Sequence, residues 1–87
     1  WAWLNPPFAN IAPWAQKCAE EAVRLARIAL LVPASVGSEW FASYVHGRAL
    51  VLPLRPRLSF DGKNPYPKDL MLCVYDAPPG FEPWRWR

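Results

Sequence analysis

Length, composition and charge limit what this chain can be. Its 87 residues suffice for one small domain, yet 53% of them are hydrophobic, including six Trp and four Phe. Such an apolar load predicts either a dense aromatic core or aromatic side chains that meet a partner. The net charge of +3 permits binding to a polyanion without demanding it, because nucleic-acid-binding domains usually concentrate far more positive charge.

The cysteines and the apolar runs indicate the compartment of the protein and argue against a zinc site and a membrane span. Cys18 and Cys73 each lie within an apolar run, which predicts buried free thiols in a reducing compartment. Together with the single His46 they cannot supply the four ligands of a zinc site at any familiar spacing. No apolar run approaches the roughly 20 residues of a membrane span, and no signal peptide is visible. We therefore expect a cytoplasmic protein with no membrane partner.

The first elements expected in chain order are a strand and a helix. Residues 1–4 read as the end of a strand that the following prolines close. Asn10 is expected to cap a helix whose first turn tolerates Pro13. Apolar residues then recur at steps of three and four, which predicts a helix with one apolar stripe: Ile11, Trp14, Cys18, Ala22, Leu25 and Ala29.

The rest of the chain continues the alternation. The unbroken apolar run 28–32 predicts a strand covered on both faces, as in a parallel sheet. Ser38 is expected to cap a second helix. The remaining expected elements are a helix at 39–45, a strand at 49–54, a short extension at 57–60, a loop at 61–69, a strand at 70–75, and a tail at 77–87 with little regular structure. Trp14 and Trp40 are expected in the core.

Alternating strands and helices predict an α/β fold, in which ligands bind beyond the carboxyl ends of the strands. The segment Asn5, Pro6, Pro7 and Phe8 stands at such an end. An amide oxygen accepts a hydrogen bond from an amino group, two prolines stiffen the backbone, and an aromatic ring stacks on a flat substrate. These residue types suit a site for an exocyclic amino group on a ring. The alternative is an Asn-Pro turn after a strand.

An ordered set of landmarks accompanies this segment: Trp3-Leu4-Asn5-Pro6-Pro7-Phe8, Ile11, Trp14, Lys17-Cys18-Ala19-Glu20-Glu21, Leu30-Leu31-Val32-Pro33-Ala34, Trp40-Phe41, Val45, Arg57-Leu58-Ser59-Phe60, and Pro65-Tyr66-Pro67 before Leu70–Val74. The set resembles the C-terminal part of the phage-type DNA N-6-adenine methyltransferase (Dam) family, over residues 1 to about 76. The resemblance implies a partial methyltransferase domain at 1–76 and a Pro/Trp/Arg-rich tail at 77–87. The implied setting is a bacterial or phage-infected cell.

The resemblance also implies roles for the four residues of the segment. The Asn5 side-chain oxygen and the Pro6 carbonyl accept hydrogen bonds from the two N–H groups of adenine's amino group. These hydrogen bonds favour the pyramidal amine, which attacks the methyl group of S-adenosylmethionine. Phe8 stacks on the base, which must leave double-stranded DNA to be reached. Pro7 belongs to the same catalytic segment. The four-residue segment by itself is shared with methyltransferases of RNA and of protein side chains, and those substrates stay open.

The resemblance places the fold as the C-terminal half of a Rossmann-like S-adenosylmethionine-dependent methyltransferase, with the first strands missing. None of the four glycines forms a Gly-rich cofactor loop, so most of the cofactor pocket is expected to be absent and the isolated fragment inactive. The alternative is a truncated, non-catalytic module retained for self-association or protein binding. A homodimer through the open sheet edge is expected in either case.

Basic and aromatic residues outside the segment give weaker hypotheses. Four cations near the loop could bind DNA phosphates or simply face solvent: Arg55, Arg57, Lys63 and Lys68. Phe60 could line the base pocket or pack in the core. The terminal Trp84-Arg85-Trp86-Arg87 could stack on bases or fray.

Overall fold

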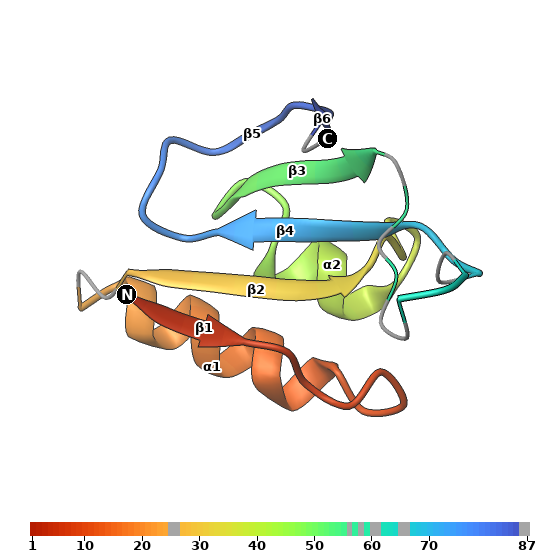
Figure 1. Ribbon diagram of the computed structural model, residues 1–87. Helices are drawn as coiled ribbons and strands as arrows, with labels where there is room; N and C mark the ends of the chain where they lie inside the picture. Colours follow the sequence, from red (N-terminus) through yellow and green to blue (C-terminus); the bar gives the residue numbers. More distant parts are fainter. Residues whose placement is uncertain (25–26, 56, 58, 60–61, 65–66, 86–87) are drawn as a thin grey trace.

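A mixed sheet with two helices forms the described part of the chain (Figure 1). The structure is a computed structural model that describes residues 1–24, 27–55, 57, 59, 62–64 and 67–85. In these residues the elements are β1 (Ala2–Leu4), α1 (Ala12–Ala22), β2 (Ile28–Pro33), α2 (Glu39–Tyr44), β3 (Leu50–Arg55), β4 (Leu70–Val74), β5 (Gly80–Phe81) and β6 (Trp84–Arg85). The expected α/β order from β1 to β4 is therefore confirmed.

The sheet has the strand order β1-β2-β4-β3-β5, and β6 pairs with β3 beyond β5. β1 runs parallel to β2, whereas β4 lies antiparallel to both β2 and β3. It follows that β1, β2 and β3 all point the same way and end at one edge of the sheet. Every residue of β2 is buried, which confirms the expected two-sided coverage, although one of its neighbours is antiparallel.

The first helix confirms the predicted element but neither its cap nor its full length, because α1 ends at Ala22 and Ala29, the last residue of the predicted stripe, lies in β2. The N-cap is Ile11, whose carbonyl accepts hydrogen bonds from the N–H groups of Trp14 (2.9 Å) and Ala15 (3.0 Å), and no side chain caps the helix. The expected cap by Asn10 is wrong, because the helix begins one residue later than the prediction requires. The backbone of Asn10 instead closes the preceding turn, donating to the carbonyl of Pro7 at 3.1 Å.

The face of α1 that meets the sheet is built from small residues. Ile11, Ala15, Cys18 and Ala19 are buried there, and Ala22 packs against the same cluster. Trp14 is 41% exposed, so its expected place in the core is wrong. It lies on the border of the buried stripe, since a step of three residues turns the helix by less than one full revolution.

The second helix begins as predicted. The Ser38 hydroxyl oxygen accepts a hydrogen bond from the N–H of Phe41 at 3.3 Å, which satisfies one of the free donors of the first turn. Phe41 is buried, and Trp40 packs partly buried against the core, as expected. Gly47 follows the helix with φ of 77°, a left-handed conformation that glycine adopts without strain.

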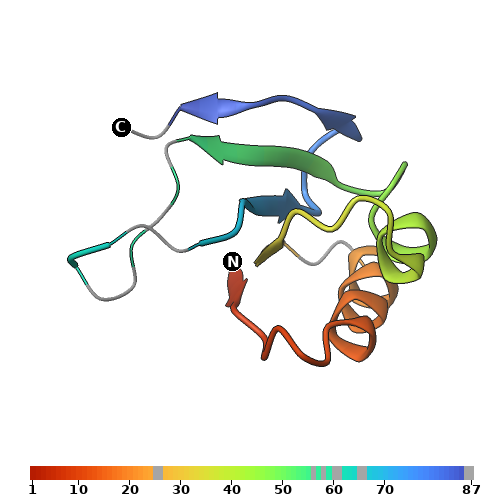
Figure 2. The same cartoon turned by 90° about the vertical axis from the view of Figure 1, so that its right-hand side faces the viewer.

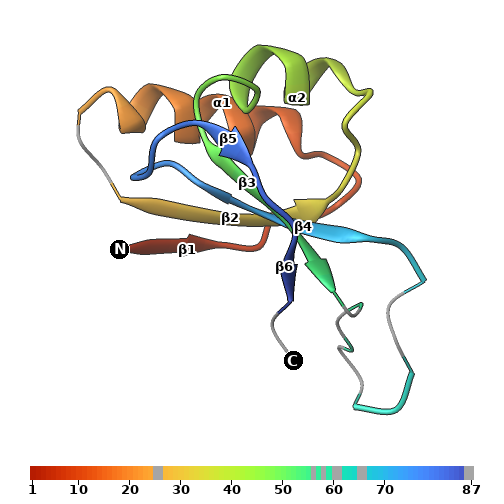
Figure 3. The same cartoon turned by 90° about the horizontal axis from the view of Figure 1, so that it is seen from above.

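Both helices lie on the same face of the sheet (Figure 3). The main core lies between them and the sheet, and it includes Leu30, Val32, Val51, Met71 and Cys73. A smaller cluster of Leu31, Leu54 and Leu70 lies apart from it, with Phe8 and Leu72 packed against it. Phe8 contacts both clusters.

The C-terminal tail has more regular structure than the sequence predicts. Residues 77–87 were expected to have little regular structure, but β5 and β6 each pair parallel with β3. The N–H of Glu82 donates to the carbonyl of Val51 at 2.8 Å, and that of Gly80 donates to the carbonyl of Ala49 at 3.4 Å. Pro83 falls between the two short strands and needs no ladder hydrogen bond there, so it does not prevent the pairing.

No helix in the described residues is long and apolar enough to cross a membrane.

Candidate active site at the carboxyl edge of the sheet

The Asn5–Phe8 segment leaves β1 at its carboxyl end and leads into α1. Leu4 packs against the main core and Pro6 is buried, so the chain is anchored on both sides of the exposed Asn5. Within the described residues no hydrogen bond engages the amide of Asn5. An exposed amide on an anchored, proline-stiffened backbone is suited to accept a hydrogen bond from a substrate.

The backbone hydrogen bond that closes the turn after Asn5 does not use the carbonyl oxygen of Pro6. The hydrogen bond from the backbone of Asn10 uses the carbonyl of Pro7. Phe8 is half-buried, with the smaller leucine cluster and the main core beside it. Phe8 therefore also has a packing role, which fixes the position of the turn.

Figure 2 looks onto the edge at which the chain leaves β1, β2 and β3. The Asn5–Phe8 segment leaves β1 there, and the segment that joins β3 to β4 begins and returns at the same edge. Four exposed cations lie at the end of β3 or in that joining segment: Arg55, Arg57, Lys63 and Lys68. The structure thus brings the predicted catalytic segment and the predicted DNA-binding segment to one edge of the sheet.

One of the four cations already has an acidic partner. The Nε of Arg57 donates to Oδ1 of Asp69 at 2.9 Å, and both side chains are largely exposed. An exposed pair of this kind adds only about 0–1 kcal/mol to stability. Its consequence is local: it ties the joining segment to the start of β4 and neutralises one positive charge at the edge.

A cavity of about 360 Å³ opens at this edge, between the loop after β2, the ends of β3 and β4, and the tail. Arg55 and Asp69 line it together with Val36, Phe81 and Pro83. Sequence reasoning missed Asp69, Phe81 and Pro83. The sign available was Phe81 standing between Pro79 and Pro83, but only the pairing of β5 with β3 brings that residue to the cavity.

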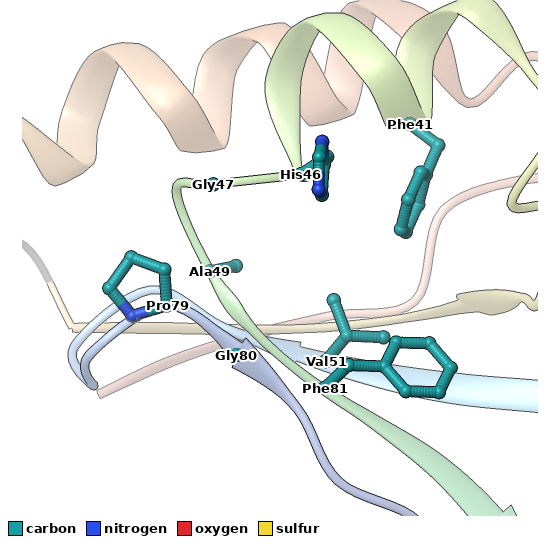
Figure 4. A pocket seen from close by; sticks show the side chains of 8 residues that line it. All are labelled: Phe41, His46, Gly47, Ala49, Val51, Pro79, Gly80 and Phe81. Carbon is teal, nitrogen blue, oxygen red and sulfur yellow. The ribbon is translucent and has the colours of Figure 1, made fainter.

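A second cavity, of about 290 Å³, lies at the opposite edge, near the start of β3 (Figure 4). The rings of Phe41 and His46 have centroids 6.2 Å apart and planes 18° apart, and they line it from α2 and the turn after α2. Val51 and Phe81 line it from β3 and β5. Phe81 therefore lines both cavities.

The buried thiols of Cys18 and Cys73 and the buried phenol of Tyr75 are unsuited to nucleophilic catalysis. Burial raises the pKa of the Cys18 thiol to about 11 and that of the Cys73 thiol to about 12. Burial also raises the pKa of Tyr75, whose hydroxyl donates to the carbonyl of Tyr44 at 2.8 Å. All three side chains are neutral at physiological pH, so neither cysteine presents a thiolate.

Features that hold a cofactor or a metal are few in the described residues. The four glycines, at positions 37, 47, 62 and 80, lie in separate segments, so they do not form a Gly-rich loop of the kind that holds phosphate or ribose groups. In the same part of the chain no group of three or more His, Cys, Asp or Glu side chains could hold a metal ion.

Several predicted positions lie outside the described residues. These are Leu25 of the helical stripe, Leu58 and Phe60 of the short extension, Pro65 and Tyr66 of the loop, and Trp86 and Arg87 of the terminal segment. Trp84 and Arg85 form β6, opposite Leu54 and Arg55 of β3.

Comparison with known proteins gives one match. The family model of DNA N-6-adenine-methyltransferase (Dam) matches residues 1–69, which include the Asn5–Phe8 segment and the four cations. Searches of curated proteins and of solved structures return no match. The match covers most of the chain, from β1 to the residue before β4. The chain belongs to the DNA N-6-adenine-methyltransferase family.

Proposed function

We propose that this chain carries the substrate-amine site of an adenine-specific DNA methyltransferase, with Asn5, Pro6, Pro7 and Phe8 as the catalytic segment. The reaction is the transfer of a methyl group to the exocyclic amino group of an adenine that has left the duplex. Such an activity requires access to DNA, as in the cytoplasm of a bacterial or phage-infected cell.

The amino group of adenine is a poor nucleophile because its lone pair is delocalised into the ring. The amide oxygen of Asn5 and the carbonyl oxygen of Pro6 accept hydrogen bonds from its two N–H groups. These hydrogen bonds favour the pyramidal amine, in which the lone pair is free to attack. As the nitrogen becomes positive in the transition state, both acceptors bind it more strongly than in the ground state. Groups held in place for developing charge are the ones that raise turnover.

Phe8 and the cations hold the nucleic acid. The ring of Phe8 stacks on the extruded base, and the packing of Phe8 against two clusters keeps that ring in place. Arg55, Lys63 and Lys68 contact phosphates, which fixes the position of the strand without reading its sequence. Arg57 acts partly through Asp69, because the two form an ion pair.

S-adenosylmethionine is the methyl donor that the family implies, and it supplies the methyl group when bound. The described residues do not fit it well: the four glycines lie in separate segments and form no Gly-rich loop, and Asp69, an acidic residue at the carboxyl edge, is paired with Arg57. We therefore assign no residue of this chain to the donor. For the same reason we expect residues 1–87 by themselves to be inactive.

The observation that supports the proposal most is the location of Asn5. It is an exposed amide on an anchored turn, directly beyond a strand, at the edge where three strands end and where the cationic segment begins. The family match includes this segment. In open α/β sheets this edge is where ligands bind. We further propose that the sheet is the C-terminal half of a Rossmann-like methyltransferase domain.

The test is methyl transfer from labelled S-adenosylmethionine to adenine-containing duplex DNA by the intact protein. Asn5→Ala should lower turnover by about 10²–10³-fold, the usual cost of losing one preorganised group of this kind. Asn10→Ala is the matched control: it is an exposed Asn in the same turn, and its side chain does not cap α1. If a folded Asn5→Ala protein methylates DNA at the wild-type rate, the segment is only a turn and the proposal is wrong.

A second proposal concerns the outer edge of β1. β1 is the first strand in the order of the sheet; Trp3 on it is 61% exposed, and Trp1 just before it is 72% exposed. Ala2–Leu4 contains no charge and no proline that would discourage pairing with another chain. We propose that two copies associate through this edge.

A further inference from the structure

The cavity at the carboxyl edge combines an apolar interior with a charged mouth. Its inner wall is formed by Leu54, Leu70 and Met71, all buried, and its outer wall by Val36, Phe81 and Pro83. Phe81 is 57% exposed although it lines the cavity, so part of its ring is open to a ligand. A volume of about 360 Å³ lies in the range of pockets that hold small ligands.

The charged mouth follows from the register of β3 and β4. Pro53 pairs with Met71, so Arg55 and Asp69 lie two residues further on each strand and share one face of the sheet. Asp69 forms its ion pair with Arg57, and among the described residues no ion pair engages Arg55. Because Asp69 is already paired with Arg57, the charge of Arg55 at the cavity is not balanced by an ion pair in the described residues. The cavity is suited to a ligand that joins a flat apolar ring to an anionic group.

We propose that this cavity binds an unstacked nucleotide of the substrate DNA, with its base against Phe81 and its phosphate on Arg55. The proposal rests on the proposed function for its choice of DNA as the ligand. A nucleotide unit has both parts that the cavity requires, a π face and a negative charge. Binding through stacking and a phosphate contact tolerates any base, because every base has a π face.

The site is distinct from the place of the target adenine. Three strand spacings separate β1, which leads to Asn5, from β3, which ends at Arg55, and this amounts to about 14 Å. Successive bases of one strand rise about 3.4 Å in a duplex, so the cavity lies about four steps from the target. The two sites share a wall: Leu54 and Leu70 line the cavity, and Phe8 packs against the cluster that contains them.

Fluorescence anisotropy with a labelled single-stranded deoxyoligonucleotide tests the proposal on the complete chain. The assay contains no methyl donor, so its outcome is independent of the turnover measured for Asn5→Ala. Phe81→Ala should weaken binding about 5- to 150-fold, the usual contribution of one stacked base, without changing the salt dependence. Arg55→Gln should weaken binding and lower the slope of log K against log salt by about 0.7, as expected for one lost phosphate contact on a single strand.

The controls are an exposed aromatic residue and an exposed arginine that lie away from the cavity. Trp14→Ala removes an exposed aromatic side chain on α1, and Arg24→Gln removes an exposed cation just beyond α1. Both should leave affinity and salt slope unchanged, with circular dichroism confirming that every variant folds. Equal losses in the controls, or wild-type binding by folded Phe81→Ala and Arg55→Gln proteins, would overturn the proposal. Displacement of the strand by an equimolar deoxynucleoside monophosphate would overturn its assignment to DNA.

Discussion

Raising the pH should unfold this protein through its two buried thiols. Cys18 and Cys73 both belong to the main core and are fully buried. Their pKa values in the folded state are about 11 and about 12, against an ordinary value of 9.0. Between pH 9 and pH 11 the unfolded chain therefore releases protons that the folded chain retains, and deprotonation pulls the equilibrium towards unfolding.

The magnitude follows from the number of protons. Each thiol removes about 1.4 kcal/mol of stability per pH unit in this window, and the contribution is fully present below pH 9. Two thiols over two pH units remove about 5 kcal/mol, which is comparable to the whole stability of a small domain. Tyr75, whose pKa burial also raises, adds to the loss above its ordinary value of 10.0.

The assay is urea denaturation at constant ionic strength, from pH 8 to pH 11, with a phosphine reductant and circular dichroism as the signal. For the wild type, the free energy of unfolding should be nearly constant up to pH 9, should fall by about 2.7 kcal/mol per pH unit between pH 9 and pH 10, and should fall more steeply above pH 10, where Tyr75 adds its own loss. Cys73→Ala should halve the slope between pH 9 and pH 10, whatever its stability at pH 8. An unchanged slope in Cys73→Ala, or a flat wild-type profile up to pH 11, would show that the thiols are not held protonated by burial.

Two further predictions concern α2 and the edge of the sheet. Ser38→Ala removes the side-chain oxygen that caps α2 and should cost about 1 kcal/mol, seen as a melting temperature lower by about 4–8 °C, whereas Ser43→Ala on the same helix should change it little. Sedimentation velocity should show association of the wild type that increases with concentration, and Trp3→Lys on the open strand should abolish it. A concentration-independent species of 9.9 kDa for the wild type would contradict the pairing through β1.

The sequence predicted most of the elements from β1 to β4 because their signals are local. A Ser before an apolar helical pattern and an unbroken apolar run each report their own conformation, and Ser38 and β2 bear this out. The failure at Trp14 has a physical cause. A helix that approaches a sheet closely buries small side chains, here Ala15, Cys18 and Ala19, and a large ring is moved to the border of the stripe.

The predictions that failed in the tail depended on distant partners. β5 and β6 have two residues each and stand among prolines, so no local pattern marks them as strands. Their conformation is set by hydrogen bonds to β3. The same holds for the site: the Asn5–Phe8 segment can be read from four adjacent residues, but the cavity joins Val36, Arg55, Asp69 and Phe81 from four separate segments.

The position of β4 has a consequence for how this protein folds. β4 lies between β2 and β3, so these two earlier strands have no common neighbour until residues 70–74 emerge from the ribosome. Until then the inward edges of β2 and β3 remain unpaired, and pairing over such separations closes slowly. Any truncation before Leu70 removes the middle strand and divides the sheet in two. The step that joins β1 and β2 to β3 therefore waits for β4, and a newly made chain passes through an aggregation-prone state before it.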